Sequence, residues 1–144
     1  MWKTTIAAGG ACPQCGEGVL STAAYDGNML YVGGGKIPNG NTGGGSVAAL
    51  DPTDGHIVWQ TACDGPVIAP IAYANGVVFT TSAKSMVAID AATGEVLSRV
   101  PTRGACVGGV AITDAGIFFG DMSGTLYCVT ATTPPARRRS VTAR

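Results

Sequence analysis

Short apolar runs separated by small polar turns recur along most of this chain. The segment VAALDPTDGHIVW, residues 47–59, consists of an apolar run, a tight turn and a second apolar run that ends in Trp59. Apolar runs of four to eight residues bounded by Gly, Asn and Asp are typical of strands, and no window places apolar residues at helical spacing. The pattern therefore predicts an all-β fold built from short antiparallel strands.

The strand–turn–strand pattern occurs twice, at a shift of 39 positions, since MVAIDAATGEVLS occupies residues 86–98. The two copies share Ala, Asp and Gly at matching positions, which are Ala49, Asp51 and Gly55 in the first and Ala88, Asp90 and Gly94 in the second. An Asp opening such a turn can accept backbone N–H bonds, and the Gly can take a positive φ. A partial third copy, GTLYCVT, keeps the strand but has Thr130 in place of the Asp.

A second hairpin precedes each of these copies. VLSTAAYDGNMLYVGG (19–34) matches VIAPIAYANGVVFTTS (67–82), and the shorter VGGVAITDAGIFFGD (107–121) follows. One unit is thus four strands over about forty residues, which is the period expected of β-propeller blades. We predict about three blades in an incomplete ring over residues 1–130. Residues 1–6 would be the end of a blade, 19–62 and 66–101 two complete blades, and 106–130 a three-stranded blade.

The spacing A-x-D-x-x-x-G-x-x-x-W, present as Ala49, Asp51, Gly55 and Trp59, resembles the tryptophan-docking repeat of pyrroloquinoline-quinone (PQQ) type β-propellers. The second copy has Ser98 where the Trp would stand. The resemblance extends over about residues 1–130. It implies one of two kinds of protein: non-catalytic scaffolds of outer-membrane assembly and the cell surface, or quinoprotein dehydrogenases that bind PQQ and Ca²⁺.

The resemblance places no catalytic residue on this chain. The dehydrogenases use a catalytic Asp, a Glu and an Asn on the metal, and often a disulfide between adjacent cysteines. This sequence has no adjacent Cys pair, and none of its acids can be aligned with those ligands. We expect no catalytic or metal-binding residue, and PQQ and calcium are implied by the resemblance alone. The expected function is a non-catalytic binding or scaffold unit, and the alternative is part of a PQQ-dependent alcohol or sugar dehydrogenase.

The five cysteines suggest a disulfide. Cys12 and Cys15 form a C-x-x-C pair, but a zinc site needs four ligands and no second pair exists. Cys63 matches Cys15 under the 48-position shift of the hairpin repeat, so the two would lie at matching points of adjacent blades. We therefore expect a bridge from Cys63 to Cys12 or Cys15, which implies an exported protein. Cys128 occupies the repeat position of Ala49, where a buried side chain is expected.

Charge and hydropathy restrict the partners. Residues 1–130 carry five basic and nine acidic side chains, a net formal charge of −4, which excludes a nucleic-acid-binding face. Arg137, Arg138 and Arg139 lie in the segment 131–144, which we expect to be a disordered basic tail. The chain shows no signal peptide and no apolar run long enough to span a membrane. The parent protein is expected to be periplasmic or at the cell surface.

Three blades do not close a ring, because propellers have typically four to eight. We expect the chain to be the C-terminal portion of a longer propeller whose other blades complete the ring. The alternative is self-association, with residues 1–6 of one copy supplying the strand that the last blade of another copy lacks. A designed or truncated repeat protein would also account for the missing signal.

Overall fold

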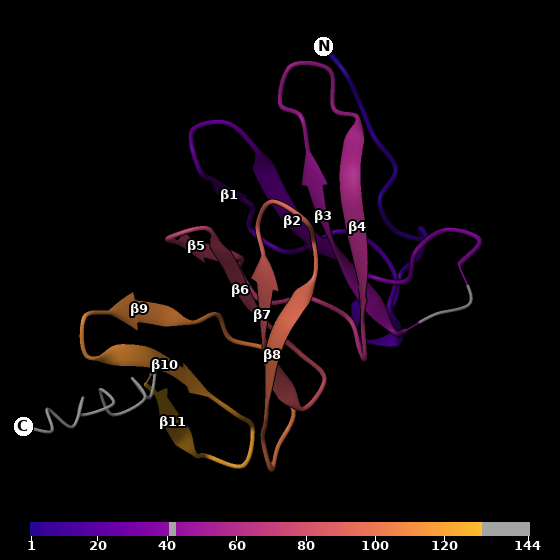
Figure 1. Cartoon of the computed structure of the whole chain (residues 1–144). Helices are drawn as coiled ribbons and strands as arrows, with labels where there is room; N and C mark the ends of the chain where they lie inside the picture. Colours follow the sequence, from indigo (N-terminus) through magenta and orange to yellow (C-terminus); the bar gives the residue numbers. More distant parts are fainter. Residues whose placement is uncertain (41–42, 131–144) are drawn as a thin grey trace, which may run out of the picture.

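The computed structural model describes residues 1–40 and 43–130, and the basic tail expected at 131–144 lies outside these residues. Eleven strands form three antiparallel sheets, which follow one another from the N-terminal to the C-terminal end of the chain (Figure 1). The first sheet contains β1 (Ala24–Tyr25), β2 (Leu30–Gly34), β3 (Gly45–Leu50) and β4 (Ile57–Cys63). The second contains β5 (Ala72–Ala74), β6 (Val77–Ser82), β7 (Ser85–Asp90) and β8 (Val96–Pro101). The third contains β9 (Ala111–Thr113), β10 (Gly116–Gly120) and β11 (Leu126–Val129).

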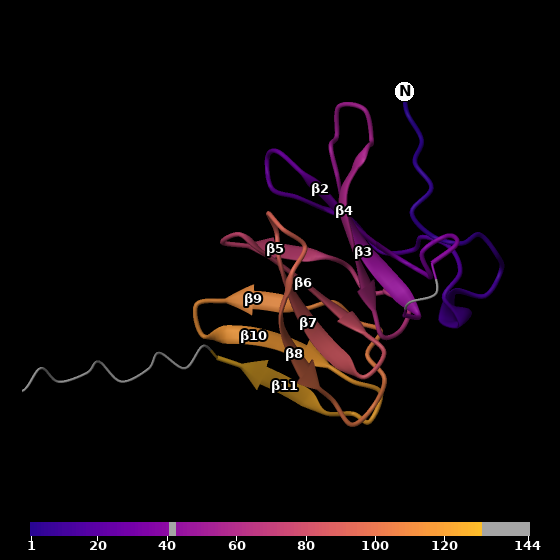
Figure 2. The same cartoon turned by 45° about the vertical axis from the view of Figure 1, so that its right-hand side comes forward.

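In every sheet the strands lie in chain order, each hydrogen-bonded to the next. Figure 2 shows the three sheets as successive layers that fan out from one another. Two sheets have four strands and the third has three, so the predicted all-β architecture of about three blades in an unclosed ring is confirmed. The only helix in the described part of the chain is the short 3-10 helix η1 (Pro13–Cys15). No described helix has the length and apolar character needed to cross a membrane.

The repeated sequence produces repeated geometry. β3 and β4 pair with a bulge between Ala49 and Leu50, and β7 and β8 pair with a bulge between Ala88 and Ile89. These are the same two positions of the repeat, immediately before the Asp that opens each turn. A bulge increases the local twist of a hairpin. The two Asp–Gly turns therefore leave their sheets in the same way.

The main core fills the space between the first and second sheets. Val47 and Ala49 of β3 and Val87 and Ile89 of β7 are buried there together with Tyr31. Successive side chains of a strand point to opposite faces. The intervening residues of β3, Ala48 and Leu50, therefore form a second, smaller cluster with Ile6 on the other face of the first sheet.

The cysteines do not pair as expected. Cys12 and Cys15 form a disulfide with each other across η1, and Cys63 is a free, buried thiol. The bridge expected from Cys63 is therefore absent from this structure. The physical reason is local: the turn of η1 brings Cys12 and Cys15 within 5.1 Å between their Cα atoms, whereas Cys63 ends β4 in the core.

Cys128 also differs from the expectation, because its side chain is exposed. The matching residues Ala49 and Ala88 are buried, since another sheet covers the third strand of the first and second sheets. No described residue covers the corresponding face of β11. Cys128 is thus exposed because it lies in the last of the three described sheets.

Thiol counting will test this arrangement. Burial raises the pKa of Cys63 to about 11, and Cys106 is also buried, so neither should react in the folded chain. We expect one reactive thiol per chain in dilute native protein, which is Cys128, and three after unfolding without reductant. Reduction before unfolding should raise the count to five. Five thiols in the unfolded, unreduced chain would contradict the Cys12–Cys15 bridge.

Candidate functional site

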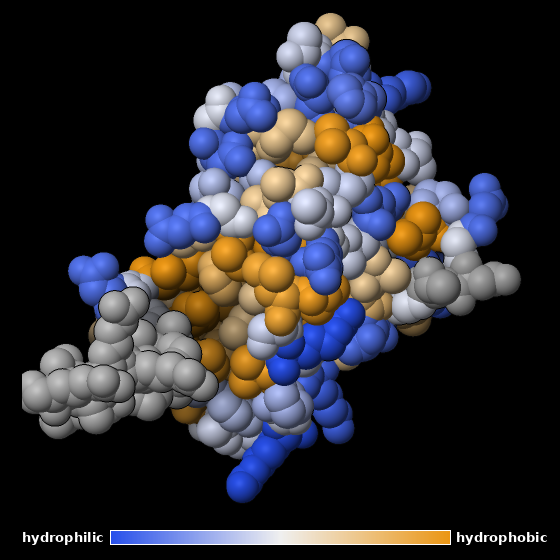
Figure 3. All heavy atoms as spheres, in the orientation of Figure 1, coloured by the Kyte–Doolittle hydropathy of each residue, from blue (hydrophilic) through white to orange (hydrophobic). Residues whose placement is uncertain are grey.

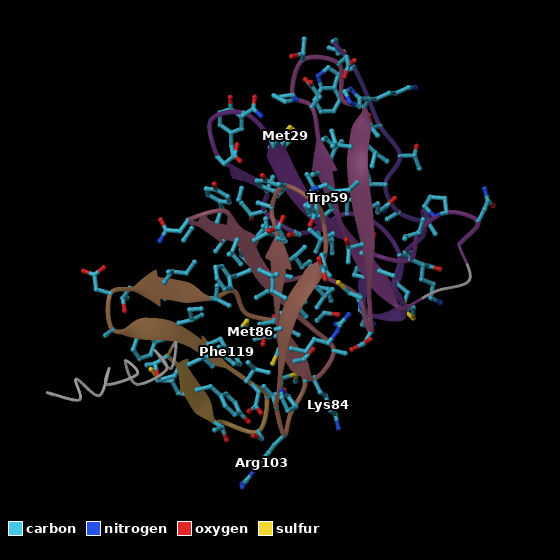
Figure 4. All side chains as sticks on the ribbon, viewed as in Figure 1. Met29, Trp59, Lys84, Met86, Arg103 and Phe119 are labelled. Atoms are coloured by element: carbon cyan, nitrogen blue, oxygen red, sulfur yellow. A yellow bond between two sulfur atoms is a disulfide. The ribbon has the colours of Figure 1, made fainter. Side chains whose placement is uncertain are left out.

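The first and second sheets are joined by an indole ring that rests on a glycine. Trp59, on the outer strand of the first sheet, donates from Nε1 to the Ala91 carbonyl oxygen at 3.0 Å in the β7–β8 turn. A Cβ on Gly94, in the same turn, would stand 2.7 Å from Cδ2 of that ring. Thr61 donates to the Gly94 carbonyl oxygen at 2.5 Å. Figure 4 places Trp59 between the two sheets. Trp59 therefore acts across the boundary between blades, and not within its own turn.

Trp2 makes the same contacts on the first sheet. Its Nε1 donates to the Pro52 carbonyl oxygen at 2.9 Å, and its ring covers Gly55. Thr4 donates to the Gly55 carbonyl oxygen at 2.5 Å, as Thr61 does one sheet later. Residues 1–7 thus lie on the first sheet in the way that β4 lies on the second. We call these two arrangements the Trp2 dock and the Trp59 dock.

Each dock needs the Asp–Gly turn beneath it. The Gly55 N–H donates to the Asp51 carbonyl oxygen at 2.8 Å, and the Gly94 N–H donates to that of Asp90 at 2.9 Å. Both glycines have a positive φ, +77° and +76°. The Asp90 carboxylate accepts the N–H groups of Ala92 and Thr93, and the Thr93 bond chiefly lowers its pKa. The Asp and Gly positions of the repeat therefore shape the surface that receives the indole ring.

One turn also gathers three groups that could ligate a metal. Ligand atoms of Asp51, Asp54 and His56 all lie within 4.8 Å of one another, and Asp54 and His56 are exposed. Asp54 accepts the His56 backbone N–H at 3.0 Å and lies 2.8 Å from Nδ1 of the same residue. The Asp51 carboxylate accepts the Thr53 N–H at 2.7 Å. The cluster is hydrogen-bonded within its own turn.

An open groove of about 570 Å³ lies beside the Trp59 dock, between the first and second sheets. Tyr31 stacks on Tyr73 with ring centroids 5.7 Å apart, and its ring is 6.0 Å from that of Trp59. The Tyr31 hydroxyl donates to the Asp26 carboxylate at 2.8 Å. Backbone N–H groups, that of Met29 foremost, lower the pKa of Asp26, and burial raises the pKa of Tyr31. The groove combines aromatic side chains with a fixed negative charge, which suits cationic groups.

The pairing of Asp26 with Tyr31 has a counterpart in the third sheet, and the sequence pattern predicted neither pair. The Tyr127 hydroxyl donates to the Asp121 carboxylate at 2.8 Å. Asp121 also accepts from Ser123 and from the Gly104 N–H, and the Ser123 hydroxyl is the chief cause of its lowered pKa. The shared signal is an Asp in a hairpin turn with a Tyr five or six residues later.

The third inter-blade junction has no indole ring. Ser98 occupies the position of Trp59, and a groove of about 410 Å³ lies there, between the second and third sheets. Its lining includes Met86 and Ala88 from β7 and Ile117 and Val129 from the third sheet. Figure 3 shows apolar side chains gathered at this junction, and Figure 4 places Met86 there.

Two glycine substitutions will measure how much the Trp59 dock contributes to the free energy of unfolding. Gly94→Ala and Gly76→Ala both put a Cβ on a residue with positive φ, at +76° and +79°. Only the Gly94 side chain would meet a ring, since nothing lies within 4 Å of a Cβ on Gly76. We expect Gly94→Ala to lower the free energy of unfolding by about 1–3 kcal/mol more than Gly76→Ala in urea titrations. Equal losses would show that the ring does not depend on the glycine.

The pH dependence of stability will test the Asp121 cluster. A carboxylate with a lowered folded pKa adds stability that is present above its unfolded pKa, about 3.9, and is lost as pH falls through the folded value. Asp121→Asn should therefore lower the melting temperature by a few degrees at pH 7 and flatten its decline below pH about 4. Asp114→Asn is the control, since the described residues offer the Asp114 side chain no hydrogen bond. A melting profile of Asp121→Asn that parallels the unmodified chain at all pH values would contradict this role.

Comparisons with known proteins agree with this architecture. A family model described as "Outer membrane protein assembly factor BamB" matches residues 1–97. The crystal structure of BamB from Moraxella catarrhalis is similar with a TM-score of 0.58 and 21% identity, over 72% of this chain and 31% of that chain. A europium-containing methanol dehydrogenase is similar with a TM-score of 0.55 and 19% identity, over 77% of this chain and 21% of that chain. No curated protein matches the chain.

At these identities the two solved structures show the fold alone, and the chain spans less than a third of either. The family model does show the family, because residues 1–97 are well over half of the 144 residues and include both docks. The chain therefore belongs to the family described as outer membrane protein assembly factor BamB, whose repeats are of the PQQ propeller type.

Proposed function

We propose that this chain is a non-catalytic PQQ-like propeller module that serves as a binding or scaffold unit of an exported protein. The family description supports a role in assembly, since it names an assembly factor. On this proposal the chain is the C-terminal portion of a longer propeller, and the blades that flank it come from outside these 144 residues.

The proposal rests on the hydrogen bonds that the aspartate carboxylates accept. Asp26, Asp90 and Asp121 each direct a carboxylate at the N–H groups of their own turns. Such bonds favour the ionised form and commit at least one oxygen of each carboxylate to its turn. A general base must instead be free to take a proton from a bound substrate. All three carboxylates shape turns: Asp26 and Asp90 line the groove beside the Trp59 dock, whereas Asp121 belongs to the third sheet and lies outside that groove.

The described residues also do not fit PQQ with its metal. Hard cations such as Ca²⁺ take six to eight oxygen ligands. The described group closest to that set is Asp51, Asp54 and His56, which offers two carboxylates and one imidazole. Each carboxylate is already bonded to backbone or side chain of the same turn. We therefore derive no reaction step through PQQ in this chain.

The groove beside the Trp59 dock is the surface that we propose for binding. Tyr and Trp rings supply contact area at low conformational cost, and both are enriched where proteins bind partners. The Asp26 carboxylate gives the groove a negative charge among these rings. A protein segment with a Lys or Arg side chain matches that surface. The Cys12–Cys15 disulfide supports an oxidising location, the periplasm or the cell surface.

Titration with PQQ and Ca²⁺ will test the non-catalytic proposal against the dehydrogenase alternative. We expect no saturable change in Trp fluorescence and no dye reduction when alcohols or sugars are added. A peptide with a central Arg should quench Trp59, and Asp26→Asn should weaken that binding several-fold. Asp114→Asn should leave it unchanged. Saturable PQQ binding with alcohol-dependent dye reduction would overturn the proposal in favour of a dehydrogenase.

A further inference from the structure

The Cys12–Cys15 disulfide joins two residues only three positions apart, in the loop that leads from residues 1–7 to β1. A disulfide stabilises a fold chiefly by restricting the unfolded chain, and this effect grows with the length of the loop that it closes. A bridge across the single turn of η1 closes a very short loop. The fold therefore gains less from this bridge than it would from one between distant strands.

The base of the same loop is held by backbone hydrogen bonds. The Gly18 N–H donates to the Ala8 carbonyl oxygen at 2.8 Å, so the two ends of the loop meet. Lys36, just after β2, donates its N–H to the Gly16 carbonyl oxygen at 2.8 Å and accepts the Ala8 N–H at 2.8 Å. The Gly35 N–H donates to the Gly18 carbonyl oxygen at 3.0 Å. All four bonds lie outside the bridged turn, so they can persist when the S–S bond is broken.

The two cysteines of the bridge differ in access and in charge. Cys15 is exposed, whereas Cys12 is half-buried. The Lys36 side chain lies over Gly16, the residue after Cys15, because a Cβ there would stand 3.0 Å from its Cγ and 3.2 Å from its Cε. The Glu17 carboxylate lies on the other side, where it accepts the Cys12 N–H at 2.9 Å. An anionic thiolate is therefore attracted towards Cys15 and repelled from Cys12.

The core thiol of Cys63 does not compete for this bridge. Its backbone is close to the loop, since its carbonyl oxygen accepts the Gly44 N–H at 2.9 Å and the Gly44 carbonyl oxygen lies against Gly16. Burial raises the pKa of Cys63 to about 11, so this thiol stays protonated at neutral pH. Only a thiolate attacks a disulfide. The Cys12–Cys15 bridge is therefore open to thiols from outside the chain and is not rearranged by Cys63.

We propose that Cys12 and Cys15 form a thiol–disulfide exchange site that oxidises thiols of a partner protein. A partner thiolate attacks Cys15 Sγ, so a mixed disulfide forms and the S–S bond to Cys12 breaks. The bonding electron pair leaves with Cys12 Sγ, which takes a proton from water. A second partner thiolate then attacks the partner's own sulfur in the mixed disulfide and releases Cys15 as a thiolate. The partner loses two electrons and gains a disulfide, and a small disulfide such as oxidised glutathione restores the bridge.

This inference goes beyond the proposed function. Binding in the groove beside the Trp59 dock does not require exchange at Cys15, and exchange does not require the groove. An oxidising location makes the disulfide the resting form of the pair, and this is the form that accepts electrons.

Equilibration with mixtures of reduced and oxidised glutathione will test the proposal on the intact chain. Free thiols are then blocked with iodoacetamide and located by peptide mapping. We expect Cys12 and Cys15 to pass from oxidised to reduced across these mixtures, with the same reduced fraction from either starting state. The reduced chain should keep its near-UV circular dichroism and its cooperative unfolding in urea.

A structural disulfide of a secreted protein gives a different result, because it resists reduction by glutathione. A Cys12–Cys15 pair that stays oxidised in every mixture would overturn the proposal. Reduction that abolishes cooperative unfolding would also overturn it, since the bridge would then hold the fold together.

Two matched variants will identify the sulfur that is attacked. Cys12→Ser leaves the exposed Cys15, and Cys15→Ser leaves the half-buried Cys12. With oxidised glutathione, Cys12→Ser should form its mixed disulfide about ten times faster than Cys15→Ser, because access limits the exchange rate. Cys63→Ala is the control and should equilibrate with glutathione as the unmodified chain does. Equal rates in the two serine variants, or loss of exchange in Cys63→Ala, would contradict attack at Cys15.

Discussion

The packing of an indole ring on a bare glycine is the contact that places residues 1–7 on the first sheet and the first sheet on the second. Within a sheet, strands are held by backbone hydrogen bonds, but adjacent sheets are joined chiefly by side chains. Trp59 covers Gly94 and donates to the Ala91 carbonyl oxygen, so one residue supplies both apolar area and a hydrogen bond across the boundary. Burying an indole is favourable only when its N–H finds such a partner. The ring thus fixes the position of one sheet relative to the next.

That contact constrains the turn that receives it. The glycine needs a positive φ, and the carbonyl oxygen after the Asp must face the indole. The Asp90 carboxylate meets both needs, because its bonds to the N–H groups of Ala92 and Thr93 close the turn. The same logic applies to Asp51 and Gly55 under Trp2. Asp51 and Asp90 thus shape the turns that receive the indole rings, and this is the link between the fold and the proposed scaffold role.

The spacing of Ala, Asp, Gly and Trp was enough to predict the fold, because a repeated local turn leaves the same trace each time that it occurs. The sequence could also indicate that residues 1–6 end a blade, since Trp2 matches Trp59. A large ring at the end of such a repeat is also expected to pack against the neighbouring blade with its N–H on a backbone carbonyl oxygen, as Trp59 does. The sequence did not identify Gly94 as the residue beneath that ring. The bonds of Tyr31 to Asp26 and of Tyr127 to Asp121 were missed, because they connect a strand to its own turn and break the repeat alignment.

The cysteines show where the repeat alignment misleads. Matching positions on adjacent blades predicted a bridge to Cys63, but the 3-10 turn brings Cys12 to Cys15 first. Burial of Cys128 was predicted from the position that it shares with Ala49 and Ala88. Burial depends on the neighbouring sheet as well as on the residue, and at Cys128 the described chain provides no such neighbour.

The junction at Ser98 shows that a dock needs two features, an indole ring on one blade and an Asp–Gly turn on the next. Trp59 is useful because the next blade has an Asp–Gly turn. At the following junction Thr130 replaces the Asp and Pro134 stands at the glycine position, so the sequence offers no bare glycine for a ring to cover. Ser98 replaces the ring at the same junction, and a groove remains in its place. The third sheet is held instead by bonds such as that from Thr81 to the Gly108 carbonyl oxygen, at 2.8 Å. At this junction the sequence therefore lacks both the indole ring and the glycine that would receive it.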